Sequence, residues 1–231
     1  MQAVILAGGL GTRLYPFTKI IPKPLLPVGE KSVLEIQIEL LKRFEINEII
    51  FATNYKHELL ESYFGDGSRY GIRLTYSREE NPLGTCGPLS LLKEKLKNTF
   101  IVINGDILTD MAFSAAYNEH LKKNAILTVV SKEVVFPLSY GKLVSSGDMI
   151  VDIQEKPDIK VEIATGIYIM STQVLKYIPY NVYFNMDQLV QRLLDENIPV
   201  FRYKTDAYWL DIGRMEDYEK AQRLFGEKST I

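Results

Sequence analysis

The chain has 231 residues, of which 46% are hydrophobic and 24% are charged, and 27 basic against 29 acidic side chains leave a net charge of −2. This apolar content and balanced charge exclude an intrinsically disordered chain, and the length suits one large domain or two small ones. Sequence-independent binding to nucleic acid requires a basic excess, so no nucleic-acid partner is expected.

Cysteine content and hydropathy narrow the class of protein further. Cys86 is the single cysteine, which excludes an internal disulfide and a structural zinc site built from several thiolates. The first residues lack the basic region of a signal peptide, and no run of eighteen apolar residues occurs. We therefore expect a cytoplasmic protein with no membrane partner.

The first half of the sequence alternates between strand and helix patterns. Residues 3–7 form a short apolar run that is typical of a strand buried on both faces. Ser32 and Glu35 predict a capping box at the start of a helix that reaches Phe44, and residues 46–54 predict the next strand. The alternation continues with a helix over 57–64, a strand over 72–76, a helix over 88–96, a strand over 99–104, a helix over 112–123 and a strand over 125–131.

The second half is more mixed. Residues 141–144 and 149–154 flank a Ser-Ser-Gly-Asp turn and predict a hairpin. Beyond it we expect a strand over 163–170, a helix over 185–196, a strand over 200–203, an extended segment over 208–211 and a helix over 215–224. No repeat and no long linker interrupts the chain. The pattern predicts one α/β domain over 1–231, with a Rossmann-like, mixed but mostly parallel sheet and helices on both faces.

The segment after the first strand has the composition of an anion-binding loop. Its three glycines let backbone N–H groups converge on one point, at the sheet edge where parallel folds bind ligands. It is not a dinucleotide fingerprint, because position 14 is Leu14, and no Gly-Lys-Ser/Thr follows to make a Walker loop. Arg13, together with Lys23 held between two prolines, suits a triphosphate clamp. The alternative is a glycine-rich turn with surface charges.

An ordered set of short motifs then identifies a resemblance. The set comprises Gly8-Gly9-Leu10-Gly11-Thr12-Arg13-Leu14, Pro22-Lys23-Pro24-Leu25-Leu26-Pro27-Val28, Pro82-Leu83-Gly84-Thr85, Asn104-Gly105-Asp106, Glu155-Lys156-Pro157, Thr165-Gly166-Ile167-Tyr168 and Trp209-Leu210-Asp211-Ile212-Gly213. Over about residues 1–222 the chain resembles the sugar-1-phosphate nucleotidyltransferases. It looks most like mannose- or heptose-1-phosphate guanylyltransferases without the C-terminal β-helix domain of many relatives.

The resemblance implies a reaction between a nucleoside triphosphate and a sugar 1-phosphate, with residues 1–131 mainly binding nucleotide and 132–231 mainly binding the sugar phosphate. It implies Arg13, Lys23 and Lys156 as catalytic residues. The implied nucleotide contacts are Leu6, Gly8, Gly9, Gly11, Thr12, Arg13, Lys23, Glu79, Pro82, Gly84, Thr85 and Asp106. The implied sugar-phosphate contacts are Gly141, Glu155, Lys156 and Thr165. It also implies a homo-oligomer.

Two carboxylates are candidate magnesium ligands. Asp106 follows a buried strand and a glycine, and Asp211 lies in an apolar, aromatic setting where an unpaired charge is costly. Mg²⁺ takes hard oxygen ligands and keeps substrate phosphates as others, which fits such a pair. The resemblance implies that Asp106 and Asp211 hold it. Taken singly, each could instead cap a turn or a helix.

Position 79 bears on the choice of nucleotide. Uridylyl- and thymidylyltransferases of the family tend to have Gln where this chain has Glu79. A carboxylate only accepts hydrogen bonds, which suits guanine or the cytosine amino group and not the O4 of uracil or thymine. GTP is therefore the first expectation and CTP the second. The segment Ala164-Thr165-Gly166 departs from the Asn-Ala-Gly of many guanylyltransferases, which leaves the sugar open.

Three other functions account for part of the sequence. A glycosyltransferase would not need Arg13 and Lys23, and a cytidylyltransferase acting on a phosphorylated alcohol would not need Glu155 and Lys156. A non-catalytic regulatory subunit should have lost one of the charged residues of the site. His57, His120 and Cys86 have no partner residues at metal or catalytic spacing and are expected to have packing or surface roles.

Overall fold

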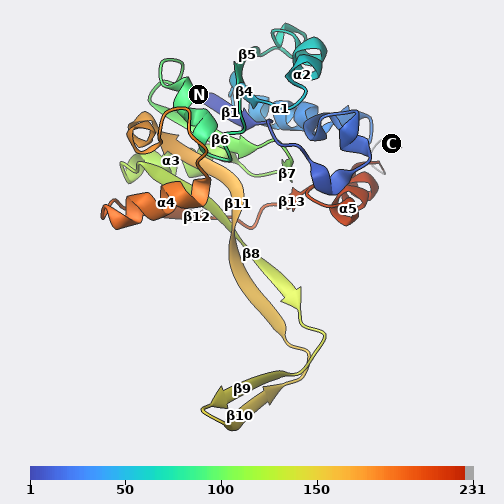
Figure 1. The fold of residues 1–231 in the computed structure, drawn as a ribbon, viewed down its shortest axis with the longest axis vertical. Helices are drawn as coiled ribbons and strands as arrows, with labels where there is room; N and C mark the ends of the chain where they lie inside the picture. Colours follow the sequence, from blue (N-terminus) through green and yellow to red (C-terminus); the bar gives the residue numbers. More distant parts are fainter. Residues whose placement is uncertain (227–231) are drawn as a thin grey trace.

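The computed structural model describes residues 1–226 and is built on a seven-stranded sheet in the order β12-β8-β11-β6-β1-β4-β5 (Figure 1). Its strands are β1 Gln2–Leu6, β4 Glu48–Thr53, β5 Arg73–Arg78, β6 Thr99–Asn104, β8 Leu127–Pro137, β11 Asp158–Ser171 and β12 Val200–Lys204. Three two-stranded sheets pair β2 Pro27–Val28 with β3 Lys31–Ser32, β7 Ile107–Thr109 with β13 Trp209–Asp211, and β9 Lys142–Ser146 with β10 Met149–Gln154.

The helices connect these strands. The α-helices are α1 Val33–Arg43, α2 His57–Phe64, α3 Phe113–Lys122, α4 Met186–Asp195 and α5 Met215–Gly226. Short 3₁₀ helices are η1 Thr12–Leu14, η2 Phe17–Lys19, η3 Lys23–Leu25, η4 Ser68–Tyr70, η5 Gly87–Leu92 and η6 Thr172–Tyr177. The capping box at Ser32 is confirmed: the Glu35 amide donates to Ser32 Oγ, and the Ser32 amide donates to the Glu35 carboxylate.

The sheet is mixed but mostly parallel, as predicted. Strand β1 pairs in parallel with β4 and β6, β4 with β5, and β8 with β12. Strand β11 is the exception, because it runs antiparallel to both of its neighbours, β6 and β8.

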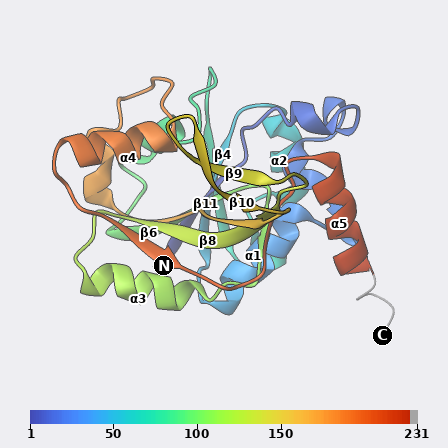
Figure 2. The same ribbon diagram turned by 90° about the horizontal axis from the view of Figure 1, so that it is seen from below.

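Both faces of the sheet are covered. Successive residues of each central strand point to opposite faces, so Ile5 and Val4 enter different core clusters, as do Ile103 and Val102. One cluster includes side chains of α1, α2 and α3, and the other includes those of η5, η6 and α4. Figure 2 shows α4 on one side of the sheet and α1 and α3 on the other. The prediction of a buried sheet between helical layers is confirmed.

Two sequence predictions were wrong in detail. The helix predicted over 88–96 is the shorter 3₁₀ helix η5, Gly87–Leu92, and at its start Cys86 N and Gly87 N both donate to the Phe184 carbonyl. Strands β8 and β11 continue well beyond the predicted 125–131 and 163–170. The added length is an exposed ladder, which continuous apolar runs do not reveal.

The order of the strands indicates where this sheet would bind a ligand. From β1 the chain builds outward through β4 and β5, and then β6 returns to the opposite side of β1. Parallel sheets bind ligands outside the carboxyl ends of strands at such a switch point. The segments that follow β1 and β6 there are the glycine-rich loop and Asp106. No helix among residues 1–226 is long and apolar enough to span a membrane.

Candidate active site

The glycine-rich loop leaves β1 after Leu6 and closes into η1. Gly11 has φ +63°, and a Cβ placed there would meet Thr18 and the Lys23 side chain within 3.1 Å, so the position requires glycine. Gly105 packs equally closely on the Leu6 carbonyl, to which its amide donates at 2.9 Å. The loop after β1 and the turn after β6 are therefore in direct contact.

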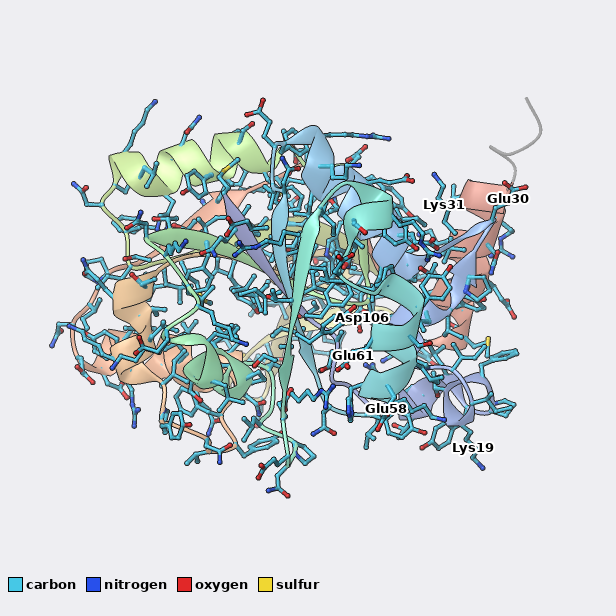
Figure 3. The ribbon with its side chains drawn as sticks, turned by 90° about the horizontal axis from the view of Figure 1, so that it is seen from above. Lys19, Glu30, Lys31, Glu58, Glu61 and Asp106 are labelled. Carbon is cyan, nitrogen blue, oxygen red and sulfur yellow. The ribbon has the colours of Figure 1, made fainter. Side chains whose placement is uncertain are left out.

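Backbone pairing brings together the two aspartates predicted to bind metal. Strands β7 and β13 pair so that Asp211 lies opposite Ile107, and the Ile212 amide donates to the Asp106 carbonyl at 3.0 Å. Lys23 lies between the two carboxylates. Its ammonium group forms an ion pair with Asp106 Oδ2 and lies 3.9 Å from Asp211 Oδ1. Figure 3 shows Asp106 within the body of the molecule, whereas Lys19 and Lys31 lie at its periphery.

The Asp211 carboxylate lies in a setting that disfavours its charged form. Burial and the nearby Asp106 charge raise the pKa of Asp211, and Lys23 and Arg13 oppose that rise. Asp211 Oδ1 is buried and accepts no hydrogen bond from the described residues. Arg13 borders the same point, because a Cβ on Gly213 would lie 3.2 Å from Asp211 Oδ1 and 3.4 Å from the Arg13 guanidinium. Lys23 is the ammonium group that lies between both carboxylates, so a further positive charge next to them would be favourable.

Glu79 joins the predicted base-binding loop to the glycine-rich loop. The Leu83 amide donates to Glu79 Oε2 at 2.8 Å, and burial raises the pKa of this carboxyl. The other oxygen, Oε1, would lie 2.8 Å from a Cβ on Gly8, so the carboxylate packs directly on the loop backbone. Asn54, which the sequence prediction missed, donates to the Glu79 carbonyl at 3.1 Å.

The loop at 82–85 is held by the start of α4. Asn185 Oδ1 accepts from the Thr85 amide at 3.1 Å, and Thr85 Oγ1 accepts from the Met186 amide at 2.9 Å. Gly84 has φ +79° and packs on Asn185 and Phe184. Asn185 was predicted only as a helix start. Its partnership with Thr85, a hundred residues away, depends on tertiary structure.

The predicted sugar-phosphate residues are placed differently. Gly141, Glu155 and Lys156 flank the β9–β10 hairpin, which Figure 1 shows at the far end of a ribbon that projects from the body holding β7 and β13. Gly141 lies next to Glu155, and Glu155 forms a 3.8 Å ion pair with Lys156. This chain does not bring them to Asp106 and Asp211. Their role stays a prediction.

Thr165 lies in the body, but its hydroxyl is hydrogen-bonded to the protein backbone. The side chain is 1% exposed, and its Oγ1 donates to the Val130 carbonyl at 2.9 Å. Its own carbonyl accepts from Trp209 Nε1 at 2.8 Å. Because Trp209 is two residues before Asp211, Thr165 helps to position the carboxylate pair. A direct hydrogen bond from this hydroxyl to a sugar would require the bond to Val130 to break.

The sequence and the fold are similar to those of known proteins. Residues 2–228 match the family described as nucleotidyl transferase, which covers nearly the whole chain. The chain belongs to the nucleotidyl transferase family. The family resemblance seen in the sequence is thereby confirmed.

Named members of the nucleotidyl transferase family differ in the nucleotide they use. The chain is 37% identical to a UTP–glucose-1-phosphate uridylyltransferase of Synechocystis sp., over 96% of the chain and 63% of that protein. It is 34% identical to a probable mannose-1-phosphate guanylyltransferase of Oryza sativa subsp. japonica, over 97% of the chain and 64% of that protein. The chain therefore spans less than two thirds of the length of these curated relatives.

A solved structure of similar size has the same fold. HddC from Yersinia pseudotuberculosis superposes with a TM-score of 0.78 at 30% identity, covering 97% of this chain and 99% of that one. A second structure of HddC is complexed with GMP-PN, and it matches with a TM-score of 0.76 at 28% identity over 97% of this chain and 99% of that one.

Three residues were expected to have packing or surface roles, and the structure places each of them away from the Asp106–Asp211 cluster. Cys86 is buried in the core, where burial raises the pKa of its thiol and makes it unreactive. His120 is buried against Thr128, and His57 lies beside Glu58 at the start of α2. None of the three lines the Asp106–Asp211 cluster.

Proposed function

We propose that this chain joins a nucleoside triphosphate to a sugar 1-phosphate, forming a nucleotide-diphospho-sugar and releasing pyrophosphate. The observation that carries the proposal is the cluster of Lys23 between Asp106 and Asp211 beneath the glycine-rich loop. This cluster lies beyond the carboxyl end of β6, next to β1, which is where open parallel sheets bind ligands. Family membership and the names of relatives support the same chemistry.

The reaction is an in-line displacement at phosphorus. An oxygen of the sugar 1-phosphate forms a bond to the α-phosphorus as the bond to the bridging oxygen breaks, and pyrophosphate leaves with that electron pair. The attacking phosphate is already anionic, so no strong general base is required. Catalysis consists of holding two anions in line and stabilising the charge that spreads between them. Arg13 and the loop amides face the departing pyrophosphate, and Lys23 contacts the triphosphate.

The carboxylate pair fits a divalent cation of the magnesium type. Asp106 and Asp211 offer hard oxygens, and the buried Asp211 Oδ1 accepts no hydrogen bond from residues 1–226. When bound there, Mg²⁺ would supply neutralising charge to the phosphates. No cluster of three or more His, Cys, Asp or Glu side chains occurs among the described residues, so substrate oxygens would complete the ligand set.

Substitutions in the cluster test the proposal through pyrophosphate release with a set of nucleoside triphosphates and hexose or heptose 1-phosphates. Asp106→Asn and Arg13→Ala should each lower kcat by roughly 10²–10³, by analogy with the loss of a single charge-stabilising donor. Asp195→Asn, an exposed substitution of the same type at the end of α4, should leave kcat unchanged. Full activity in Arg13→Ala would reject its assignment.

We propose GTP as the nucleotide, because Glu79 presents a hydrogen-bond acceptor between the glycine-rich loop and the base loop. The GMP-PN complex of HddC supports this choice. In Glu79→Gln the side chain gains a donor, so the ratio of kcat/KM for GTP over UTP should fall about tenfold or more. A parent protein that strongly prefers UTP or dTTP would overturn the choice of base.

Cytidylyl transfer is the second candidate. A carboxylate at position 79 also suits the cytosine amino group, so CTP with a sugar 1-phosphate or another phosphorylated acceptor belongs in the same assay. We further propose that Gly141, Glu155, Lys156 and Thr165 bind the sugar phosphate, that Lys156 is catalytic, and that the enzyme works in the cytoplasm as a homo-oligomer.

A further inference from the structure

A long arm projects from the body of the molecule. We define the arm as residues 132–164: the outer parts of β8 and β11, which pair as a ribbon, and the β9–β10 hairpin at its tip (Figure 1). None of these residues is buried, and none belongs to a core cluster. An isolated two-stranded ribbon is only marginally stable in water. The arm therefore lacks the packing that the rest of the chain has.

The ribbon has one polar and one apolar face. Residues paired across a ladder share a face, so Phe136 lies with Ile159 and Val134 with Val161. The opposite face carries Glu133 and Glu162, which form ion pairs with Lys204 at 3.2 Å and Arg202 at 2.8 Å on β12. Phe136 is 51% exposed. Ion pairs therefore connect the polar face to the chain's own sheet, whereas Phe136 and Val161 on the apolar face stay exposed.

The tip continues the apolar surface. Met149, Ile150, Val151 and Ile153 of β10 are 59–70% exposed, and Leu143 lies opposite Ile153 on β9. Apolar patches of this kind mark interaction sites in soluble proteins. The body also has exposed apolar side chains: Tyr180, Val182 and Tyr183 lie just before Asn185, which holds the loop at 82–85.

The arm also separates the two halves of the proposed site. Gly166 on β11 packs against Asn104, two residues before Asp106. From there β11 extends back to Asp158, and eight residues of strand cover about 26 Å. Glu155 and Lys156 lie beyond that point. The Asp106–Asp211 cluster of the same chain is thus about 25 Å or more from them along the strand.

The base of the arm is fixed against folding back. The ladder between β8 and β11 is continuous from Pro137–Asp158 to Ser131–Ala164, and its register shifts only between Ala164 and Tyr168. Thr165 holds that shift through its bonds to Val130 and Trp209. Bending the arm onto its own body would break these contacts and the ion pairs to β12.

We propose that the arm docks on a second copy of this chain and supplies Glu155 and Lys156 to that copy's Asp106–Asp211 cluster. The inference rests on the proposed function, because it assigns the sugar-phosphate residues of one site to two chains. A reciprocal exchange about a two-fold axis completes both sites, covers both apolar ribbons, and is the commonest symmetry of soluble oligomers.

Complementation between two inactive variants tests the exchange. Asp106→Asn disables the body and Lys156→Ala the arm, and each homodimer should lose at least about 95% of its pyrophosphate release, as expected for a lost charge at the reacting phosphates. A heterodimer, co-expressed with two tags and purified on both, has one site with an intact body and an intact arm. It should show about half of the wild-type activity. A heterodimer as inactive as its parents, or full activity in Lys156→Ala alone, would overturn the proposal.

Sedimentation measures the assembly without relying on activity. The wild-type chain should sediment as a dimer, and Ile150→Asp with Val151→Asp at the tip should yield monomers of unchanged unfolding free energy. Leu121→Asp, 47% exposed on α3, is the control and should remain a dimer. A monomeric wild type, or tip variants that stay dimeric, would refute the exchange. A dimer that releases no pyrophosphate from any triphosphate refutes the proposed function instead.

Discussion

The body and the arm share two strands, β8 and β11, and the two regions differ in what covers these strands. In the body, Ile167 and Met170 of β11 are at most 1% exposed, because helices cover both faces of the sheet. In the arm, Val161 of the same strand is 40% exposed. Strands β8 and β11 pair in both regions, with a register shift between Ala164 and Tyr168 where the regions meet.

This contrast separates two contributions to stability that usually occur together, backbone pairing and the burial of apolar side chains. Backbone pairing sets the direction of β11 over its whole length, but only the body adds the burial of apolar area that stabilises a fold. The body can therefore hold charged groups such as Asp106 and Lys23 in fixed positions. The arm has no such packing, so the position of Lys156 becomes fixed only when the arm docks on another surface.

The largest expected effect compares one phenylalanine from each region. Phe51 is fully buried and packs edge-on against Phe64 and Tyr76, so Phe51→Ala should cost about 3–5 kcal/mol of unfolding free energy. Phe136→Ala in the arm should cost less than about 0.5 kcal/mol when the protein is dilute enough to be monomeric. Urea denaturation of both variants measures the difference. Equal losses would show that the arm packs on its own body.

The same contrast explains what the sequence could predict. Continuous apolar runs such as 99–104 predicted the buried strands, and the Ser-Ser-Gly-Asp turn predicted the β9–β10 hairpin, because both signals are local. The reach of β8 and β11 was missed. Its ladder is stabilised by pairing between positions such as Phe136 and Ile159, which no local pattern reveals.

The site divides in the same way. Glycine spacing and the framed Lys23 pointed to an anion site from local chemistry alone. The meeting of Asp106 and Asp211 depends on two three-residue strands about a hundred positions apart, and only the family resemblance suggested it. Asn54 and Asn185 were missed because neither carries a signal before the fold brings it to Glu79 or Thr85.

Alanine substitution at two glycines with positive φ, one in the arm and one in the body, should give a smaller difference in unfolding free energy. Gly147 in the arm has φ +59° with open space around it, so Gly147→Ala should cost only the backbone strain of about 1 kcal/mol. Gly166 in the body has φ +75°, and a Cβ there would lie 2.6 Å from Asn104 Nδ2. Gly166→Ala should therefore cost about 2–3 kcal/mol.

Activity separates the two glycine variants further. Displacing Asn104 moves the turn that carries Asp106, so pyrophosphate release should fall in Gly166→Ala beyond what unfolding explains. Thermal unfolding and kcat, measured on the same preparations, test both effects. A Gly166→Ala protein as stable and active as Gly147→Ala would show that the turn after β6 tolerates displacement.

Acid sensitivity is a third expected difference between the two regions, and it belongs to the body. His120 is 1% exposed, with its Nδ1 2.9 Å from Thr128 Oγ1, and burial lowers its pKa from about 6.5 to about 4. Between these values the unfolded chain binds a proton that the folded chain does not, so stability falls as the pH drops below about 6.5. The loss between pH 7 and pH 5 should be about 2 kcal/mol.

Two variants assign this loss to the body. His120→Asn keeps a hydrogen-bonding group near Thr128 but cannot titrate, so its unfolding free energy should change with pH by about 2 kcal/mol less than that of the wild type. Glu133→Gln removes an exposed arm carboxylate whose pKa is lowered chiefly by its hydrogen bond to Lys204, and it should leave the acid sensitivity intact. Urea titrations at pH 7, 6 and 5 measure all three proteins. If the acid sensitivity persisted in His120→Asn, a group other than His120 would cause it, and its assignment to His120 in the body would be wrong.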